Sequence, residues 1–372
     1  MNDLPQGKLE GAAVTVADPK AASQLHNKGW HGTPQSGGGL QLSLLEAAYL
    51  VEAGRLEVVR GGDMPATDGE DVPADGVPAG GPVSLGDLIA AGRAGDPSFE
   101  IRYIVYRDLR ERGYVVHHST TPGVDLEVFP RGETPKDGTY MWMLAVSERA
   151  SFATAPFIAM LKRAEELDRK LLIGVVDEEG DVTHYRAQLR EMKGALPSEP
   201  QGELEGWAFE DRVLAFDLAG ADALAPKGHL GRRLGSVHQL SLIEAAWLAR
   251  TGKLHLRDAE TNRPVAAEDV VAHARERQGD FDLRLRVYTD LRARGLVAKT
   301  GFKYGTHFRA YDEDPEGHHA KFLVHAVPRD HETSWPELSR AVRLAHGVRK
   351  EMVFGAADEA GVEYLKIRRV RP

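Results

Sequence analysis

The sequence predicts a protein of mixed α+β and α/β class, built as two tandem repeats. Each repeat is expected to hold an α+β half followed by an α/β half with a mixed sheet. Gln41–Leu50 (QLSLLEAAYL) recurs as Gln239–Leu248 (QLSLIEAAWL), an offset of 198 residues. Tyr106–Gly113 (YRDLRERG) recurs as Tyr288–Gly295 (YTDLRARG), an offset of 182. Similarity within one chain at such a spacing indicates a duplicated structural unit.

The offset falls by 16 residues between the two anchors, so the first repeat carries extra residues there. We expect them in Gly61–Gly81, GGDMPATDGEDVPADGVPAGG. This segment is rich in Gly, Pro and Asp and has almost nothing to bury, which is typical of a mobile surface loop.

The first half of each repeat is expected to contain a short strand, a glycine-rich loop, a helix that begins with a capping box, and a strand pair or turn. The predicted strands are Ala12–Val16 and Arg212–Phe216. The predicted capping boxes pair Ser43 with Glu46 and Ser241 with Glu244.

The second half is expected to open with an amphipathic helix, over Phe99–Arg112 or Phe281–Arg294. Apolar residues recur there at helical spacing, and Gly113 or Gly295 can supply a left-handed C-terminal residue. Strands and one more helix follow, namely Tyr140–Val146, Ala155–Leu167 and Leu171–Val176, then Lys321–Val327, Trp335–Val348 and Met352–Ala356. The segment His184–Gly194 reads as helical, and the Pro/Gly/Glu-rich residues 195–206 read as a linker.

The composition is that of a globular protein with more than one domain. With 372 residues, 42% hydrophobic and 28% charged, the chain is long enough for two or more packed domains. No apolar run of membrane-spanning length and no signal-peptide core are present, which predicts a cytoplasmic protein without membrane association. The absence of cysteine excludes disulfides and thiolate metal sites.

The net charge of −9 argues against a nucleic-acid-binding protein, but the distribution matters more than the sum. Residues 340–372 hold eight Lys or Arg against four Asp or Glu. The C-terminal end is therefore basic on a chain that is acidic elsewhere.

Three polar residues of the second repeat could converge. Tyr311 closes a strand-like run, His319 precedes the next one, and Lys350 lies at a helical segment some thirty residues later. A phenol, an imidazole and an ammonium can together remove a proton, donate one and stabilise a developing negative charge.

Three ordered motifs contain these residues: FKYGTHFRAY at Phe302–Tyr311, HAKFLV at His319–Val324 and RLAHGVRK at Arg343–Lys350. In their order and spacing they resemble the motifs of the archaeal tRNA-splicing endonucleases. The resemblance covers most of the chain, because the first repeat carries the same pattern in decayed form. It implies a fused two-repeat enzyme that acts as a homodimer.

The resemblance also implies the chemistry. The enzyme would cut pre-tRNA introns at bulge–helix–bulge junctions, with no metal and no cofactor, leaving a 2′,3′-cyclic phosphate and a 5′-hydroxyl. Tyr311 would be the general base on the ribose 2′-hydroxyl, and His319 the general acid for the leaving 5′-oxygen. Lys350 would stabilise the pentavalent phosphate. His318 is a competing acid, and His307 is expected to be structural or to contact phosphate.

Binding residues follow from the same resemblance. Arg343 and Arg369 would sandwich a bulged base of the RNA held by the partner subunit, with Arg368 as an alternative to Arg369. The acidic turn of the first repeat would contact a basic cleft of the partner. Its candidate contact residues are Asp177, Glu178, Glu179 and Asp181.

The first repeat is expected to be inactive. Alignment puts Phe129 at the position of Tyr311 and Gly138 at that of His319, and neither can transfer a proton. Arg169 aligns with Lys350 without a gap, and Lys170 aligns with it if one residue is skipped.

The resemblance and the repeats together divide the chain into five parts. They are 1–92 and 93–194 for the N-terminal and pseudo-catalytic subdomains of the first repeat, 195–206 for the linker, and 207–276 and 277–372 for the N-terminal and catalytic subdomains of the second. Two other functions stay open. A non-catalytic RNA-binding or assembly subunit would fit a chain whose repeats had both decayed. A metal-dependent nuclease would need clustered carboxylates, which RAVRLAHGVRK before Lys350 does not offer.

Overall fold

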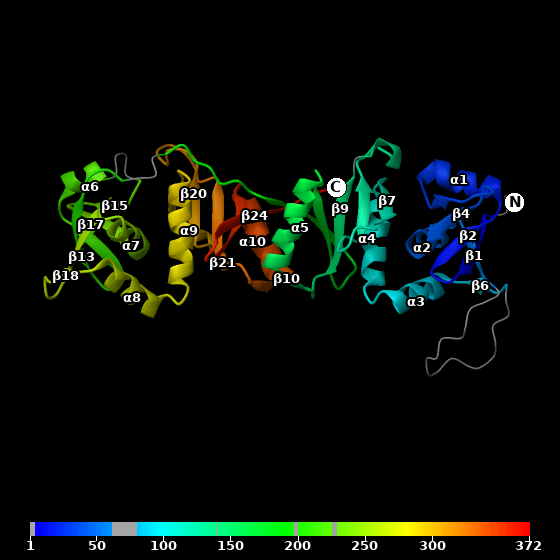
Figure 1. The fold of residues 1–372 in the computed structure, drawn as a ribbon, viewed down its shortest axis with the longest axis horizontal. Coiled ribbons are helices and arrows are strands. Elements are labelled where there is room, and N and C mark those ends of the chain that lie inside the picture. Colours follow the sequence, from blue (N-terminus) through cyan, green and yellow to red (C-terminus); the bar gives the residue numbers. More distant parts are fainter. Residues whose placement is uncertain (1–3, 62–79, 139, 197–199, 225–228) are drawn as a thin grey trace. The chain divides into compact units, whose positions relative to one another are not determined.

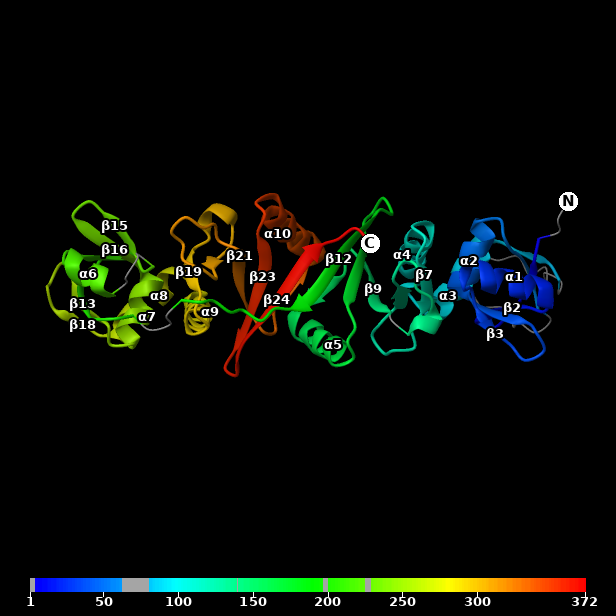
Figure 2. The same cartoon turned by 90° about the horizontal axis from the view of Figure 1, so that it is seen from above.

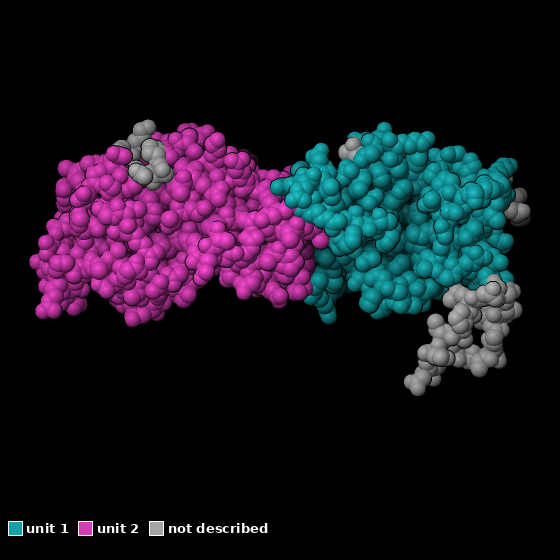
Figure 3. All heavy atoms as spheres, in the orientation of Figure 1, with its two compact units in different colours: residues 1–150, 163–186, 369–372 teal, residues 151–162, 187–368 magenta. Residues whose placement is uncertain are grey.

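The computed structural model describes residues 4–61, 80–138, 140–196, 200–224 and 229–372. These residues form two compact units, which Figure 3 distinguishes by colour. Unit 1 comprises Met1–Ala150, Arg163–Arg186 and Arg369–Pro372, and unit 2 comprises Ser151–Lys162 and Ala187–Arg368. Most of the loop predicted at Gly61–Gly81 lies outside the described residues. No described helix is both long and apolar enough to cross a membrane.

Unit 1 begins with a six-stranded sheet of order β3-β4-β2-β1-β5-β6 and three helices. The strands are β1 (Gln6–Glu10), β2 (Ala13–Val16), β3 (Thr33–Pro34), β4 (Leu40–Ser43), β5 (Glu57–Arg60) and β6 (Pro82–Val83), and the helices are α1 (Pro19–Gly29), α2 (Leu44–Glu52) and α3 (Leu85–Gly95). Unit 2 repeats this arrangement in the order β15-β16-β14-β13-β17-β18. Its strands are β13 (Leu204–Ala208), β14 (Arg212–Ala215), β15 (Arg232–Leu234), β16 (Val237–Ser241), β17 (Leu254–Asp258) and β18 (Pro264–Val265), and its helices are α6 (Leu218–Leu224), α7 (Leu242–Arg250) and α8 (Ala267–Arg277).

The C-terminal half of the first repeat combines a helix with strands of a mixed sheet. It contains α4 (Phe99–Glu111), β7 (Val115–His118), β8 (Leu126–Phe129), the short helix η1 (Pro135–Asp137), β9 (Met141–Ser147), β10 (Ser151–Ala153), α5 (Thr154–Glu166), β11 (Leu171–Val176) and β12 (Val182–Leu189). Strand β9 pairs with β8 in antiparallel and with β11 in parallel orientation. The fold prediction of two repeats with mixed sheets is confirmed.

The C-terminal half of the second repeat has the same order. It contains α9 (Phe281–Ala293), β19 (Val297–Thr300), the short helix η3 (Phe302–Tyr304), β20 (Phe308–Tyr311), β21 (Phe322–Pro328), β22 (Glu332–Ser334), α10 (Trp335–Gly347), β23 (Glu351–Asp358) and β24 (Gly361–Arg369). Helix α9 lies beside β20 (Figure 1). It packs against β19, β21 and β23, and α10 packs against β23 (Figure 2).

Part of the first repeat is packed into unit 2. Strand β10 pairs with β22, and the Phe152 ring lies 5.5 Å from the Trp335 ring, measured between centroids. Ile158 of α5 is fully buried in a cluster with Val327 and Ala356. The two repeats are thus joined by a shared apolar core in unit 2 as well as by the chain.

The predicted helix ends are confirmed in both repeats. Ser43 and Ser241 each form the expected capping box with the glutamate three residues later. Gly113 and Gly295 follow α4 and α9 with φ angles of 86° and 78°, in the left-handed region that glycine occupies without strain.

Three predictions about local structure are wrong. His184–Gly194 is not helical, because β12 covers its first part and buries Tyr185 and Ala187, which alternate onto one face as in a strand. Lys350 is not helical, because α10 ends at Gly347 and Arg349 turns the chain with a φ of 55°. Strand β13 begins at Leu204, inside the segment interpreted as a linker. Helices α1, α3, α6 and α8 were not predicted from the sequence, nor were several strands, among them β1, β7, β19 and β24.

Candidate active site

The sheet of unit 2 brings the three predicted catalytic positions to one edge. Tyr311 is the last residue of β20, which runs antiparallel to β21, with Ala310 opposite Phe322. Strand β21 is parallel to β23, with Phe322 opposite Glu351. The end of β20 therefore lies beside the starts of β21 and β23. His319 lies three residues before β21, and Lys350 immediately before β23.

A direct hydrogen bond ties two of these positions together. The Lys350 Nζ donates to the carbonyl oxygen of Ala320 at 2.6 Å, and Ala320 is the residue after His319. Lys350 is half-buried and Ala320 is buried, so this contact fixes the ammonium beside the segment that carries the histidine. The same Nζ lies 5.8 Å from the centroid of the Tyr304 ring.

The two adjacent histidines differ in their surroundings. His318 Nδ1 hydrogen-bonds the carbonyl oxygen of Asp314 at 2.9 Å, within the turn that precedes β21. His319 is exposed, and in the part of the chain that the structure describes its ring has no hydrogen-bond partner. His319 is therefore the histidine whose nitrogens are open to a substrate.

His307 has a structural role. The backbone N–H of Ala326 donates to His307 Nδ1 at 2.9 Å, and His307 Nε2 lies 3.2 Å from a carboxylate oxygen of Asp280. Burial, followed by the charges of His325 and Arg284, lowers the pKa of His307 to about 4. A neutral imidazole with both nitrogens engaged ties the residue before β20 to β21 and is not available for catalysis.

Strand registers relate the two repeats residue by residue. Val115 pairs with Phe129 as Val297 pairs with Tyr311, both at an offset of 182. The predicted equivalence of Phe129 and Tyr311 therefore agrees with the fold.

The register also decides between Arg169 and Lys170. Leu171 lies opposite Trp142 as Met352 lies opposite Leu323, an offset of 181 in both strands. Carried back two residues, this offset places Arg169 at the position of Lys350. The left-handed residues that precede them agree, because Asp168 has a φ of 52° and Arg349 one of 55°.

The first repeat keeps the geometry of this edge and lacks its reactive groups. The Arg169 guanidinium donates to the carbonyl oxygen of Gly138 at 3.3 Å and lies 4.0 Å from the Tyr140 ring centroid. Gly138 corresponds to His319 and offers no side chain. Phe129 is buried against the rings of His117 and Tyr140.

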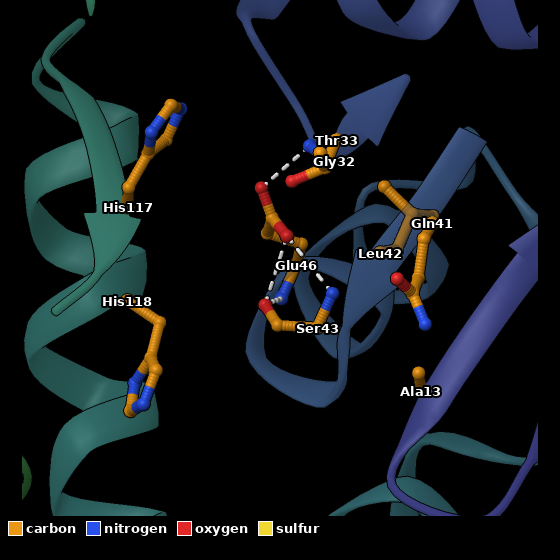
Figure 4. Close-up of a pocket in the computed structure, with 9 residues that line it drawn as sticks. All are labelled: Ala13, Gly32, Thr33, Gln41, Leu42, Ser43, Glu46, His117 and His118. Atoms are coloured by element: carbon orange, nitrogen blue, oxygen red, sulfur yellow. Dashed lines mark hydrogen bonds between the residues drawn. The ribbon is translucent and has the colours of Figure 1, made fainter. Parts of the chain in front are cut away.

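One polar cavity of unit 1 shows how the repeats diverge at another point (Figure 4). It has a volume of about 280 Å³ and is lined by Ala13, Gly32, Thr33, Gln41, Leu42, Ser43, Glu46, His117 and His118. In the second repeat, Lys299 replaces His117 and donates to Glu244 at 2.9 Å, where Glu244 corresponds to Glu46. None of the predicted catalytic residues lines the cavity.

A second cavity, of about 660 Å³, lies in unit 2 and also lacks the predicted catalytic residues. It is lined by Arg250, Arg275, Asp282, Leu285, Arg286, Thr289, Asp290, Ala293, Gly361 and Val362. Within the described residues, no three or more His, Cys, Asp or Glu side chains gather as they would around a metal ion.

The predicted RNA-binding arginines are exposed. Arg343 lies on α10 in unit 2, and Arg369 is the last residue of β24 and belongs to unit 1. Arg368, the alternative to Arg369, is exposed as well. Arg343 and Arg369 therefore belong to different units.

The acidic turn of the first repeat links β11 to β12. Asp177 Oδ1 accepts from the backbone N–H groups of Glu179 at 3.0 Å and Asp181 at 2.9 Å. Glu178 forms an ion pair with Arg149. Asp177 therefore shapes the turn, and Glu178, Glu179 and Asp181 are exposed.

The approach of the Tyr304 ring to Lys350 was not predicted from the sequence. Tyr304 belongs to the first of the three motifs, but the tyrosine seven residues later drew the catalytic interpretation. Tyr304 and Lys350 are 46 positions apart, and no spacing rule connects them. The presence of Tyr304 in the motif Phe302–Tyr311 was the one sequence feature that could have pointed to this contact.

These features define a duplicated α/β protein whose second repeat brings Tyr311, His319 and Lys350 to one edge of a sheet. Comparison with known proteins identifies the family. The description "tRNA intron endonuclease, catalytic C-terminal domain" matches residues 99–184 and 281–364, and "tRNA intron endonuclease, N-terminal domain" matches residues 5–67 and 201–271. The chain belongs to the tRNA intron endonuclease family.

Similar proteins extend over the whole chain. The tRNA-splicing endonuclease of Methanococcoides burtonii is 36% identical over 367 residues, covering 96% of this chain and 97% of the relative. That of Methanosarcina acetivorans is 35% identical over 98% of this chain and 99% of the relative. That of Haloferax volcanii is 33% identical over 99% of this chain and 100% of the relative. The predicted membership and the internal duplication are confirmed.

Proposed function

We propose that this protein is a tRNA-splicing endonuclease that removes introns from pre-tRNA at bulge–helix–bulge junctions without a metal ion. The observation that carries the proposal is the hydrogen bond from Lys350 to the Ala320 carbonyl. It holds an ammonium beside His319, at the sheet edge where Tyr311 ends β20. Family membership and the similarity to named splicing endonucleases over the whole chain support it.

The three side chains would divide the reaction between them. Tyr311 takes the proton of the ribose 2′-hydroxyl, whose oxygen attacks the adjacent phosphorus. The bond from phosphorus to the 5′-oxygen breaks, and His319 gives that oxygen a proton. Lys350 stabilises the extra negative charge on the pentavalent phosphate. The products are a 2′,3′-cyclic phosphate and a 5′-hydroxyl.

The nucleophile belongs to the substrate in this scheme. The protein needs to supply only proton transfer, charge stabilisation and alignment of the RNA. The guanidinium of Arg309 lies 6.0 Å from the centroid of the Tyr311 ring, so a cation stands close to the proposed base.

We further propose a homodimer in which the acidic turn of each chain contacts a basic cleft of the other. The exposed carboxylates of Glu178, Glu179 and Asp181 support this role. Arg343 and Arg369 would stack on a bulged base, because a planar guanidinium suits such a contact. Each chain would contribute one active and one inactive repeat, so the dimer would have two catalytic sites.

The test is cleavage of an intron-containing pre-tRNA by the purified protein in EDTA, followed by identification of the RNA ends. We expect two cuts, each with a cyclic phosphate and a 5′-hydroxyl. Activity that EDTA abolishes and magnesium restores would favour a metal-dependent nuclease. Tight RNA binding without any cleavage would favour an assembly subunit.

A further inference from the structure

The turn Gly301–Gly305, with the sequence GFKYG, joins β19 to β20 and presents an aromatic ring to solvent. Phe302 is 87% exposed, the highest fraction among the exposed large hydrophobic residues that the structure describes. Lys303 beside it is also exposed. We call this segment the aromatic turn. A phenylalanine ring held almost entirely in water gives up the stabilisation that burial provides.

The aromatic turn has a defined conformation. The N–H of Tyr304 donates to the carbonyl of Gly301 at 2.8 Å, and that of Gly305 donates to the carbonyl of Phe302 at 3.1 Å. Gly305 has a φ of 60°, and a Cβ at Gly301 would lie 2.5 Å from the Thr306 carbonyl oxygen. Its glycines are therefore required by the backbone, and Phe302 is displayed from an ordered support.

The turn reaches the proposed site through Tyr304. The Tyr304 ring centroid lies 5.8 Å from Lys350 Nζ, the group proposed to stabilise the phosphate charge. Phe302 and Lys303 occupy the same single helical turn as Tyr304. The exposed aromatic ring and ammonium of the turn are thus carried by the residues next to the one that approaches Lys350.

The first repeat provides an internal comparison. Gly301 N–H donates to the carbonyl of His307 at 3.0 Å, and Ser119 N–H donates to that of Asp125 at 3.1 Å. The donor Gly301 lies 182 residues after Ser119, and the acceptor His307 lies 182 residues after Asp125. The two turns therefore have equal length and are closed by the same hydrogen bond. The first repeat has Thr120, Thr121 and Pro122 where the second has Phe302, Lys303 and Tyr304. The backbone turn is retained in both repeats, but the aromatic and basic side chains occur only in the repeat that carries Tyr311, His319 and Lys350.

We propose that Phe302 stacks on an unpaired base of the substrate RNA and that Lys303 contacts a phosphate of the same strand. The inference rests on the proposed function, because it takes RNA as the molecule at Lys350. An aromatic face accepts any base, and an adjacent ammonium adds a contact without sequence preference. Phe302 and Lys303 thereby position the strand for cleavage at Lys350.

The experiment measures the affinity of a fluorescent bulged RNA for the full chain in EDTA, alongside its cleavage. Phe302→Ala is expected to weaken binding roughly 5- to 150-fold, the usual range for one stacked base. Phe302→Trp restores a stacking surface and should bind within about threefold of the native protein. Phe209→Ala is the matched control, because Phe209 is 41% exposed at a turn of the N-terminal subdomain, and it should leave binding unchanged.

Lys303→Met tests the second contact. Loss of one phosphate contact should reduce the slope of log affinity against log salt by about 0.7 to 0.9. Phe302→Ala should leave that slope unchanged. An unchanged slope in Lys303→Met would remove the lysine from the proposal.

The outcomes separate the two proposals. Native protein that binds but does not cut the RNA contradicts the proposed function, and the Phe302 variants still decide the stacking. Native protein that cuts the RNA while Phe302→Ala binds as tightly overturns the stacking alone. Failure of the native protein to bind any RNA overturns both. A fall in oligomer mass for Phe302→Ala with unchanged RNA affinity would assign the ring to a protein contact and also overturn the inference.

Discussion

Replacing Lys350 by methionine tests the site most directly, because the chain contains a matched control. Methionine keeps the length and apolar stem of lysine and removes the ammonium. Arg169 occupies the equivalent register position in the first repeat, and it also donates to a main-chain carbonyl, that of Gly138. Arg169→Met therefore removes a similar contact from a place with no proposed chemistry.

The structure gives the expected losses of stability and of cleavage rate. Lys350→Met leaves the buried Ala320 carbonyl without its 2.6 Å partner, which costs about 1–3 kcal/mol of folding free energy. Removal of one preorganised group from a developing anion typically costs about 2.7–4 kcal/mol in the barrier, a rate loss of roughly 10²–10³. We expect Lys350→Met to show both losses. Arg169→Met should lose stability only, from its 3.3 Å hydrogen bond and its contact with Tyr140.

The assay is single-turnover cleavage of an end-labelled pre-tRNA in EDTA, at a temperature where thermal melts show both variants to be folded. A folded Lys350→Met protein that cleaves within about tenfold of the native rate would refute the assignment of charge stabilisation to this residue. An equal rate loss in Arg169→Met would show that the effect is transmitted through the fold.

Three further outcomes are expected. His319→Ala should lower the cleavage rate by roughly two to four orders of magnitude, and His318→Ala by less than about tenfold, because the ring of His318 is engaged with Asp314; reversed losses would move the acid by one residue. Reversing the exposed carboxylates of the acidic turn to lysine, with Asp177 kept, should lower the light-scattering mass from twice 40.7 kDa to 40.7 kDa and reduce activity; a stable, active dimer would mean that the turn is only solvated surface. Burial would raise the pKa of Glu244, but the Lys299 ammonium and hydrogen bonds outweigh it and hold the pKa below 4.5. Glu244 therefore stabilises the native state above pH 4.5 and loses this effect as the pH falls through its lowered pKa, so the difference in unfolding free energy between native and Glu244→Gln proteins should shrink on acidification; a difference independent of pH would contradict this.

Local signals predicted much of the fold. The apolar spacing of α4 and α9 and the glycines that end them give the helix bounds to within one residue. Both capping boxes are visible in the sequence because Ser and Glu lie three residues apart. The strand character of β12 was not visible, since its charged residues suit a helix equally well.

The candidate site was predictable only in part. Motif spacing singled out Tyr311, His319 and Lys350, and the strand order brings them to one edge. The bond from Lys350 to Ala320 and the approach of Tyr304 depend on tertiary packing across 30 and 46 residues. No periodicity within a segment encodes such contacts.

The two repeats differ in side-chain chemistry and agree in main-chain hydrogen bonding. The N–H of Ala145 donates to Asp125 at 2.8 Å, as that of Ala326 donates to His307 at 2.9 Å. The same main-chain N–H is thus hydrogen-bonded in both repeats, although the acceptor is a carboxylate in the first and an imidazole in the second. A buried N–H must be satisfied for the sheet to form, but the type of acceptor is free to change.

That asymmetry would explain how a repeat without the proposed catalytic side chains persists beside one that has them. Sheet registers and turn closures stabilise the fold in both repeats, and neither depends on the acid–base chemistry proposed for Tyr311 and His319. Loss of the reactive groups at Phe129 and Gly138 therefore leaves the folding of the first repeat intact. Its β10 and Ile158 still complete the core of unit 2, where Phe152 packs on Trp335. Deleting this segment would expose part of the core of the second repeat, so the first repeat is needed for its structure although it lacks the proposed catalytic side chains.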